Sequence, residues 1–302
     1  MKKPLSVKFA ALMLAMLAAG SVQANDALKK MKETGTITMG VRESSGAMSY
    51  TLGANVYAGF HHDVCQRVLA DIQKQLGVKK LDIKYQSVTP QNRIPLVQNG
   101  TVDIECGTTT NSAARQKDVA FAPTLYVEEV RVAVKTSTGF NSIAQLANKT
   151  VSATTGTTSV QLLRKHERAN KADIKALMGK DNSEAFLLLE SGRADANIAD
   201  GQILATLISM SKNSSSYRLL DEVLSIEPIA IMLNKNDVGF KKAVDDSIKA
   251  MAASGEIAKL YDKWFMQPIP PNNTKVGLPP NALTKAAWAN PSDKPLEDYL
   301  PN

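Results

Sequence analysis

The feature that most constrains the fold of this chain is a repeated order of strand, polar turn and helix. Residues 35–44, GTITMGVRES, predict a strand that runs into a polar turn. Residues 62–77 carry apolar side chains at helical spacing and end at Gly77, a common helix stop. This alternation predicts an α/β fold with mostly parallel sheets.

The same order continues through the next stretch. Residues 80–88 predict a strand, 89–100 a short helix, and 101–107 a further strand. For the short helix we expect Thr89 as the N-cap and Pro90 at the first helical position, because the N–H that proline lacks would be unpaired there anyway.

The pattern restarts in the middle of the chain. Residues 149–159, KTVSATTGTTS, predict a strand and a turn rich in hydroxyl groups. Residues 183–204 predict a helix, a strand and another polar turn. Residues 128–136 and 226–235 lack helical periodicity and are interpreted as buried strands that flank this second block.

This organisation predicts two lobes joined by two hinge strands. The first lobe would comprise residues 25–131 and 230–302, and the second, residues 132–229, would be inserted between them. Open α/β sheets bind ligands beyond the carboxyl ends of their strands, so we expect a ligand cleft between the lobes.

The first residues predict a signal peptide over 1–24. A basic start is followed by an apolar stretch at 9–19 and by Val22-Gln23-Ala24, a typical cleavage site. No cysteine lies near that site, so we expect a periplasmic protein without a lipid anchor. No later stretch is apolar enough to predict a membrane helix.

Composition limits the partners and the redox state. The chain has 36 Lys and Arg against 29 Asp and Glu, a formal net charge of +7. These basic residues are scattered and aromatic residues are few, which argues against nucleic-acid binding and for a modest attraction of anions. The two cysteines, Cys65 and Cys106, would enter an oxidising compartment, which favours one disulfide over the alternative of two buried thiols.

Polar turns at strand ends are the candidate binding positions. After the strand at 101–107 come Thr108, Thr110 and Arg115. A buried guanidinium is the side chain best suited to grip a carboxylate through two hydrogen bonds. The alternative is an ordinary surface arginine at the start of a helix.

Further polar side chains stand at equivalent turns. Thr158 lies at a predicted helix N-terminus, which favours anions, although simple N-capping explains the same threonine turn. Asp200 follows a strand and could pair with an ammonium group or merely form an Asp-Gly turn. Arg42 and Arg93 add cations at a strand exit and a helix start, where a single arginine is more often a surface residue.

Positive signs of catalysis are missing from the sequence. The histidines are His61, His62 and His166, and adjacent side chains on a helix cannot converge on one metal ion. No serine or cysteine stands in a context that would activate a nucleophile. We therefore expect neither an enzyme nor a metal or other cofactor.

Six segments of the chain stand out together: VRESS, SVTPQNRIPLVQNGTVDIECGTTTN, AARQKDVAFAPT, TTGTTS, LLLESGRADA and DKWFMQPIPPNN. They resemble the periplasmic solute-binding proteins of polar amino-acid ABC transporters. QNRIPL, ECGTTTN and PIPP are more typical of the branch that binds acidic amino acids. The resemblance implies a two-lobed periplasmic-binding-protein type II fold, in which lobes hinged by two strands close on a ligand.

The resemblance also implies how the common part of an amino acid is held. Arg115 would bind the α-carboxylate with help from Thr158. Thr108 and Thr110 would contact the α-carboxylate and the α-amino group, and Asp200 would pair with the ammonium.

Specificity would be decided at the other end, where Arg42 and Arg93 would grip the side-chain carboxylate of glutamate or aspartate. Pro90 and Asn182 depart from the family pattern, which has serine and histidine there; Asn182 would contact the ligand by hydrogen bonds alone. Two further buried arginines would be costly unless the ligand brings a second negative charge. Glu43 is a possible internal partner but is poorly placed beside Arg42.

We therefore expect a monomeric receptor that captures L-glutamate or L-aspartate and delivers it to an inner-membrane ABC permease. The first alternative changes the ligand to glutamine, asparagine or another polar amino acid. The second is an enzyme on the same fold, since some relatives are cyclohexadienyl dehydratases, with Asp200 or Glu184 as acid or base.

Overall fold

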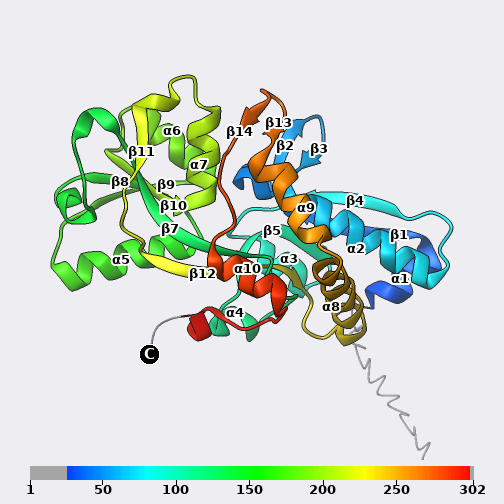
Figure 1. Ribbon diagram of the computed structural model, residues 1–302. Helices are drawn as coiled ribbons and strands as arrows, with labels where there is room; N and C mark the ends of the chain where they lie inside the picture. Colours follow the sequence, from blue (N-terminus) through cyan, green and yellow to red (C-terminus); the bar gives the residue numbers. More distant parts are fainter. Residues whose placement is uncertain (1–25, 300–302) are drawn as a thin grey trace, which may run out of the picture.

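Two lobes joined by a shared pair of strands make up the computed structural model, which describes residues 26–299 (Figure 1). The predicted signal peptide over 1–24 lies outside the described residues. Within 26–299, no helix combines the length and the apolar character needed to cross a membrane.

The first lobe has three parallel strands at its centre, together with shorter antiparallel pairs. Its strands are β1 (Thr36–Val41), β2 (Tyr50–Gly53), β3 (Val56–Ala58), β4 (Asp82–Ser87), β5 (Ile104–Thr110), β6 (Ala120–Phe121), β13 (Pro268–Ile269) and β14 (Thr274–Lys275). Its helices are α1 (Ala27–Thr34), α2 (Phe60–Leu76), α3 (Arg93–Gln98), α4 (Ala113–Gln116), α8 (Val238–Ala253), α9 (Glu256–Tyr261) and α10 (Ala282–Ala289). β1 pairs in parallel with β4 on one side and β5 on the other.

The second lobe repeats this arrangement on a smaller scale. Its strands are β8 (Thr150–Thr154), β9 (Lys175–Gly179), β10 (Ala196–Asp200) and β11 (Tyr217–Leu219), and its helices are α5 (Thr158–Asn170), α6 (Asn182–Glu190) and α7 (Gly201–Met210). β8 pairs in parallel with β9 and with β10. Short helical turns of the chain are η1 (Gly46–Met48), η2 (Thr136–Thr138), η3 (Ile143–Leu146), η4 (Ser214–Ser216), η5 (Asp262–Met266) and η6 (Leu296–Tyr299).

Two long strands, β7 (Tyr126–Lys135) and β12 (Ser225–Leu233), form the hinge. They pair antiparallel with each other, while β7 also pairs with β10 and β12 with β5. The result is one path of strands through both lobes, in the order β4-β1-β5-β12-β7-β10-β8-β9. The predicted lobe boundaries, 131/132 and 229/230, fall inside these two strands and stay a prediction.

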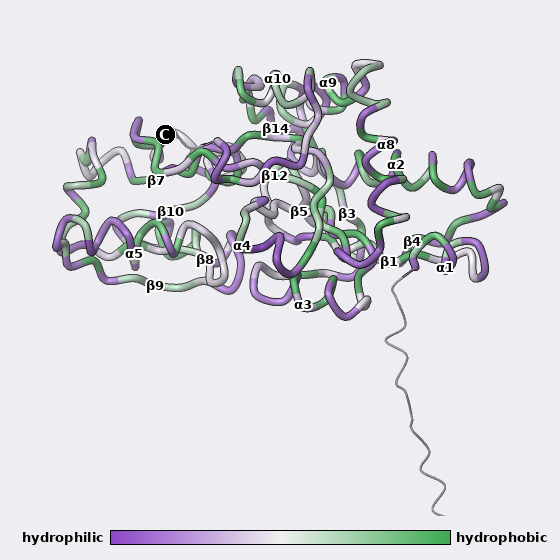
Figure 2. Tube along the Cα trace, turned by 90° about the horizontal axis from the view of Figure 1, so that it is seen from below, coloured by the Kyte–Doolittle hydropathy of each residue, from purple (hydrophilic) through white to green (hydrophobic). Residues whose placement is uncertain are grey.

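Each lobe has its own apolar core. The first includes Phe60 and Leu69 of α2 together with Phe240 of α8, and the second includes Val132 of β7 and Ile198 of β10. Hydrophobic and hydrophilic residues alternate along α5 in Figure 2, as expected for a helix with one face on a sheet.

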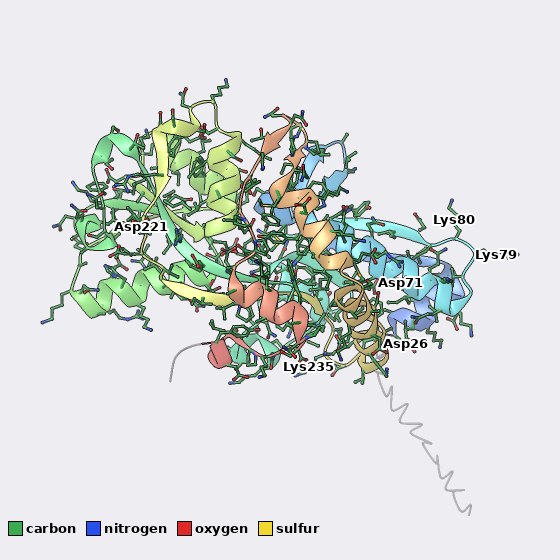
Figure 3. All side chains as sticks on the ribbon, in the orientation of Figure 1. Asp26, Asp71, Lys79, Lys80, Asp221 and Lys235 are labelled. Carbon is green, nitrogen blue, oxygen red and sulfur yellow. A yellow bond between two sulfur atoms is a disulfide. The ribbon has the colours of Figure 1, made fainter. Side chains whose placement is uncertain are left out.

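Charged side chains project from the outer surface. Lys79 and Lys80 mark one end of the molecule in Figure 3, whereas Lys235 lies on another side. All three are exposed, so basic residues are spread over the surface as the sequence suggested.

The predicted disulfide is confirmed. Cys65 of α2 and Cys106 of β5 are bonded, with their Cα atoms 6.4 Å apart and both side chains buried. The bond therefore ties the helix that covers the first sheet to the strand that leads into the cleft.

Two predicted element boundaries are wrong by a few residues. The short helix begins at Arg93 and not at Pro90, because Thr89 and Asn92 form a turn in which each side chain accepts from the other's backbone N–H. β5 continues to Thr110, because that residue pairs with Ile229 of β12. The threonines predicted in a turn are thus strand residues.

Candidate functional site

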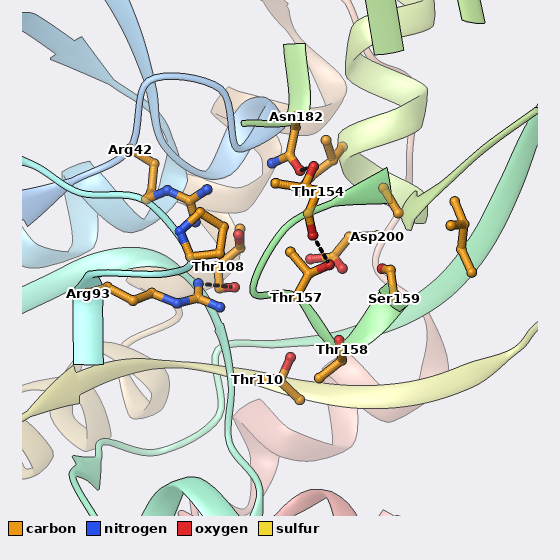
Figure 4. A pocket seen from close by; sticks show the side chains of 14 residues that line it. Arg42, Arg93, Thr108, Thr110, Thr154, Thr157, Thr158, Ser159, Asn182 and Asp200 are labelled. Carbon is orange, nitrogen blue, oxygen red and sulfur yellow. Dashed lines mark hydrogen bonds between the residues drawn. The ribbon is translucent and has the colours of Figure 1, made fainter. Parts of the chain in front are cut away.

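A polar cavity lies where strand ends of both lobes face each other (Figure 4). Its lining residues are Arg42, Pro90, Arg93, Thr108, Thr110, Thr154, Thr157, Thr158, Ser159, Asn182, Ile198, Ala199, Asp200 and Ile203. Every predicted ligand-binding residue except Arg115 is among them, so the fold gathers side chains that are far apart in the sequence.

Two buried arginines occupy the first-lobe side of the cavity. Arg42 follows β1 and Arg93 opens α3, and each is only 2% exposed. Arg93 Nη1 donates to the carbonyl oxygen of Thr108 at 2.9 Å, which fixes its guanidinium at the end of β5. Burial, and next the charge of Arg93, lower the pKa of Arg42 to about 10. The two cations thus repel each other in a site with little water.

A buried carboxylate that the sequence analysis missed lies near these arginines. Glu105 of β5 is fully buried, its Oε2 accepts from the Thr109 hydroxyl, and its Oε1 has no hydrogen-bond partner. Its charge opposes the pKa lowering of Arg42 and Arg93. Gly107 gives this group room: a Cβ there would lie 2.6 Å from Arg42 Cγ and would collide with Glu105 Oε1.

The arginines are nevertheless not locked in close ion pairs. Among residues 26–299, no ion pair within 4 Å includes Arg42, Arg93 or Arg115. Glu43, the internal partner considered from the sequence, accepts a hydrogen bond from Ser87 and is exposed. The guanidinium groups therefore keep donors that an anionic ligand can use.

Arg115 lies just outside the set of lining residues. It belongs to the short helix α4, and its Nη1 donates to the carbonyl oxygen of Thr110 at 2.9 Å. Loss of surrounding water, followed by the charge of Arg93, lowers the pKa of Arg115 to about 10. Its guanidinium is thus anchored to the strand residue that does line the cavity.

One hinge residue connects the threonines of the two lobes. Oε2 of Glu227, on β12, accepts from the Thr110 hydroxyl at 2.7 Å and from the Thr158 hydroxyl at 2.8 Å. Thr110 ends β5, whereas Thr158 begins α5 in the other lobe. N-capping by threonine, the alternative considered from the sequence, is not formed at this helix, since the Thr157 hydroxyl donates instead to the Thr154 carbonyl.

Asp200 lines the second-lobe side of the cavity. It ends β10 and stands at the N-cap position of α7, yet its side chain makes no capping bond. Burial, and then the charge of Glu227, raise the pKa of Asp200 to about 7 against the opposing effect of the three arginines. Its carboxylate is therefore free to pair with a cationic group.

Glu128 is a third acid of the hinge region. It lies opposite Glu227 in the β7–β12 pair, and its Oε1 accepts from the backbone N–H groups of Glu129 and Gln202. Burial, followed by the charge of Asp200, raises the pKa of Glu128 well above its usual range. The protonated, neutral form of Glu128 is therefore favoured.

Asn182 joins the lobes at the far end of the cavity. Its Nδ2 donates to the carbonyl oxygen of Ser44 in the first lobe, and its Oδ1 accepts from the Thr154 hydroxyl, both at 2.7 Å. The amide keeps one N–H and one lone pair for further partners. Its contact with a ligand stays a prediction.

The histidines play no part in this site. His61 is fully buried, its Nδ1 contacts the carbonyl oxygen of Gly107, and burial lowers its pKa to about 4. No group of three or more His, Cys, Asp or Glu within 26–299 is arranged to hold a metal ion.

Sequence reasoning missed the buried acids Glu105, Glu128 and Glu227. A signal for them was present, since each is an isolated charge or charge pair inside an apolar strand, in DIECG, YVEEV and IEPIAIML. A glutamate at such a position is rarely left without a function or a partner. A count of the charges around the cavity must therefore set the three arginines against Asp200 and these three buried glutamates.

The chain is similar to solute-binding proteins over most of its length. Residues 37–267 match the family model described as bacterial extracellular solute-binding proteins, family 3. The chain is 41% identical to the L-glutamate/L-aspartate-binding protein of Pseudomonas aeruginosa, across 89% of this chain and 90% of that protein. It is 38% identical to the glutamate/aspartate import solute-binding protein of Escherichia coli, across 95% and 97% of the two chains.

A solved structure shares the fold. It is an ancestral amino acid-binding protein described as a precursor of cyclohexadienyl dehydratase, and it matches with a TM-score of 0.68 at 23% identity. The match covers 79% of this chain and 99% of that one.

Proposed function

We propose that this chain, which belongs to the bacterial extracellular solute-binding proteins of family 3, captures L-glutamate or L-aspartate and delivers it to an ABC importer. The observation that carries the proposal is the pair of buried arginines, Arg42 and Arg93, in a small cavity that also contains Asp200. The names of the relatives at 38% and 41% identity support the same ligands.

The proposed pose uses the charges at both sides of the cavity. Arg115 holds the α-carboxylate, together with the N-terminus of α5 at Thr158. The ammonium group pairs with Asp200. Arg42 and Arg93 bind the side-chain carboxylate, whose negative charge offsets the repulsion between them.

Ligand capture would stabilise the closed arrangement of the lobes. The proposed contacts come from both lobes, so the ligand binds the closed form more tightly than the open form and shifts the population toward it. We further propose that the protein works in the periplasm as a monomer, presents its closed form to an inner-membrane permease, and is not an enzyme.

A neutral ligand such as glutamine is the main alternative. Glu105 supplies part of the negative charge that a neutral side chain would lack, which keeps this alternative open to test. Against it, Glu105 makes no ion pair within 4 Å with the arginines, so a ligand carboxylate is the better partner.

The test is thermal unfolding of ligand-free protein with each of the twenty amino acids. At a hundred times its Kd, a ligand should raise the free energy of unfolding by roughly 2.7 kcal/mol. We expect the shift with glutamate or aspartate, and its loss in Arg93→Met for these two ligands. A shift with glutamine and none with glutamate or aspartate would refute the acidic-ligand proposal.

A further inference from the structure

Glu227 acts on the cavity without lining it. The side chain is fully buried on hinge strand β12, and its Oε2 accepts both the Thr110 and the Thr158 hydroxyl. Thr110 and Thr158 do line the cavity, and Figure 4 shows them close to each other below Asp200. Any influence of Glu227 on a ligand must therefore pass through these hydroxyls or through its charge.

The direction of these two hydrogen bonds decides what the hydroxyls can offer a ligand. A threonine hydroxyl has one proton and two lone pairs, whereas an ionised carboxylate only accepts. When the hydroxyls of Thr110 and Thr158 both donate hydrogen bonds to Glu227, only their lone pairs are left to face the cavity. Lone pairs attract an ammonium group and repel a carboxylate.

The charges around Glu227 support this polarity. Arg93 and Arg115 lie close enough for the charge of Glu227 to oppose the lowering of their pKa values by burial. The negative charge of Glu227 also acts on Asp200, whose pKa it raises. The hinge side of the cavity therefore concentrates negative charge and acceptor atoms.

We propose that Glu227 is a positioning residue for the ligand's ammonium group. It turns the hydroxyls of Thr110 and Thr158 into acceptors and adds its charge to that of Asp200. The α-carboxylate is then left to Arg115 and to backbone N–H groups at the start of α5, and not to the threonine hydroxyls. This inference rests on the proposed function, because it assigns a part of the same amino-acid site.

The test compares each acidic amino acid with the analogue that lacks only the amino group, by titration calorimetry. The ligand pairs are glutamate with glutarate and aspartate with succinate. In Glu227→Gln the preference for the amino acid over its analogue should fall at least about tenfold, since hydrogen bonds to charged groups contribute on that scale. In Thr158→Val the amino acid should bind more weakly while the analogue binds as before.

A matched control lies on the same hinge. Glu129 neighbours Glu128 on β7 and pairs with Arg131, with its side chain partly exposed. Glu129→Gln should leave the preference unchanged. Retained binding of glutarate or succinate, with an unfolding transition like that of the wild type, shows that each variant is folded.

The outcomes separate the possible failures. If Glu227→Gln or Thr158→Val weakened the binding of the amino acid and of its analogue equally, Glu227 would only hold the two lobes together. That result would overturn the inference. An unchanged preference in Glu227→Gln would overturn it as well. Wild-type protein that binds neither glutamate nor aspartate would refute the proposed function itself.

Discussion

The two lobes meet the cavity with different chemistry. The first lobe presents the buried cations Arg42 and Arg93, with Arg115 anchored behind Thr110. The second lobe presents hydroxyl groups, the amide of Asn182 and a single carboxylate, Asp200. Under the proposed function, the first lobe would select a ligand by its negative charges, and the second lobe would add hydrogen bonds when the lobes close.

Contacts between the lobes themselves support this division. Besides the bond from Asn182 to Ser44, the backbone N–H of Ala47 donates to the Thr206 hydroxyl at 3.2 Å. These bonds contain no ligand atom, so part of the stability of the closed form belongs to the protein.

The largest effect is expected from removing a first-lobe cation. Arg115→Ala should weaken binding of glutamate or aspartate by about 2–5 kcal/mol, because the α-carboxylate would lose its charged partner. Titration calorimetry measures this loss. Arg131→Ala, in a hinge pair with Glu129, is the control and should bind normally. Full binding by Arg115→Ala would contradict the α-carboxylate assignment.

Opening the disulfide should affect stability rather than recognition. Replacing both Cys65 and Cys106 by serine removes a cross-link between residues 41 apart in sequence, which should lower the free energy of unfolding by about 3 kcal/mol. Urea unfolding of the oxidised wild type and the variant measures the change. Ligand affinity should stay within about twofold at temperatures where both are folded, and a large loss of affinity would mean that the bond positions the site.

Acidity should weaken the second-lobe contact to the ammonium group. Because the pKa of Asp200 is about 7, each pH unit below 7 should reduce affinity about tenfold, and affinity should level off above 7. Titration calorimetry from pH 5 to about 8 checks this expectation. A pH-independent affinity of the wild type would contradict the pairing of Asp200 with the ammonium.

Stability of the ligand-free protein should depend on pH in the opposite direction. Asp200 binds its proton more tightly in the folded protein than in an unfolded chain, where its pKa is close to 3.8. The folded form therefore loses stability as pH rises from about 4 to 7 through this group. Asp200→Asn should remove this contribution from thermal unfolding and should also flatten the pH dependence of binding.

The smallest effect is expected at the contact between the lobes. Asn182→Ala removes the hydrogen bonds to Ser44 and Thr154 and should weaken ligand binding by about 1 kcal/mol, through a smaller closed population. Asn170→Ala, at the exposed end of α5, is the control. A loss as large as that of Arg115→Ala would show that the second lobe also contributes to charge selection.

Local patterns predicted the elements better than their ends. Helical periodicity and Gly77 predicted α2, which the structure confirms. The order of strands and helices predicted an α/β fold of two lobes, which the family match confirms. The extent of β5 could not be predicted from local patterns, because its last residues are strand only through pairing with distant Ile229. The start of α3 was also missed, because the side chains of Thr89 and Asn92 each accept a hydrogen bond from the other residue's backbone N–H and form a turn there.

The sequence predicted those site residues whose charged side chains stand in turns at strand ends. Arg42, Arg93 and Asp200 stand at strand ends, where the fold class alone suggests a ligand. Glu105 and Glu227 were missed because a charge within an apolar strand acquires its meaning from groups brought near it by pairing with other strands. The charge count from sequence was therefore incomplete, although its conclusion stands as the proposal.

Gly107 limits how this receptor can change over generations. Every replacement of that glycine adds at least a methyl group, which would lie 2.6 Å from Arg42 Cγ and would displace Glu105. Position 107 therefore cannot vary freely while Arg42 and Glu105 keep their places. Variation that leaves Arg42 and Glu105 in place is therefore expected at other positions around the pocket.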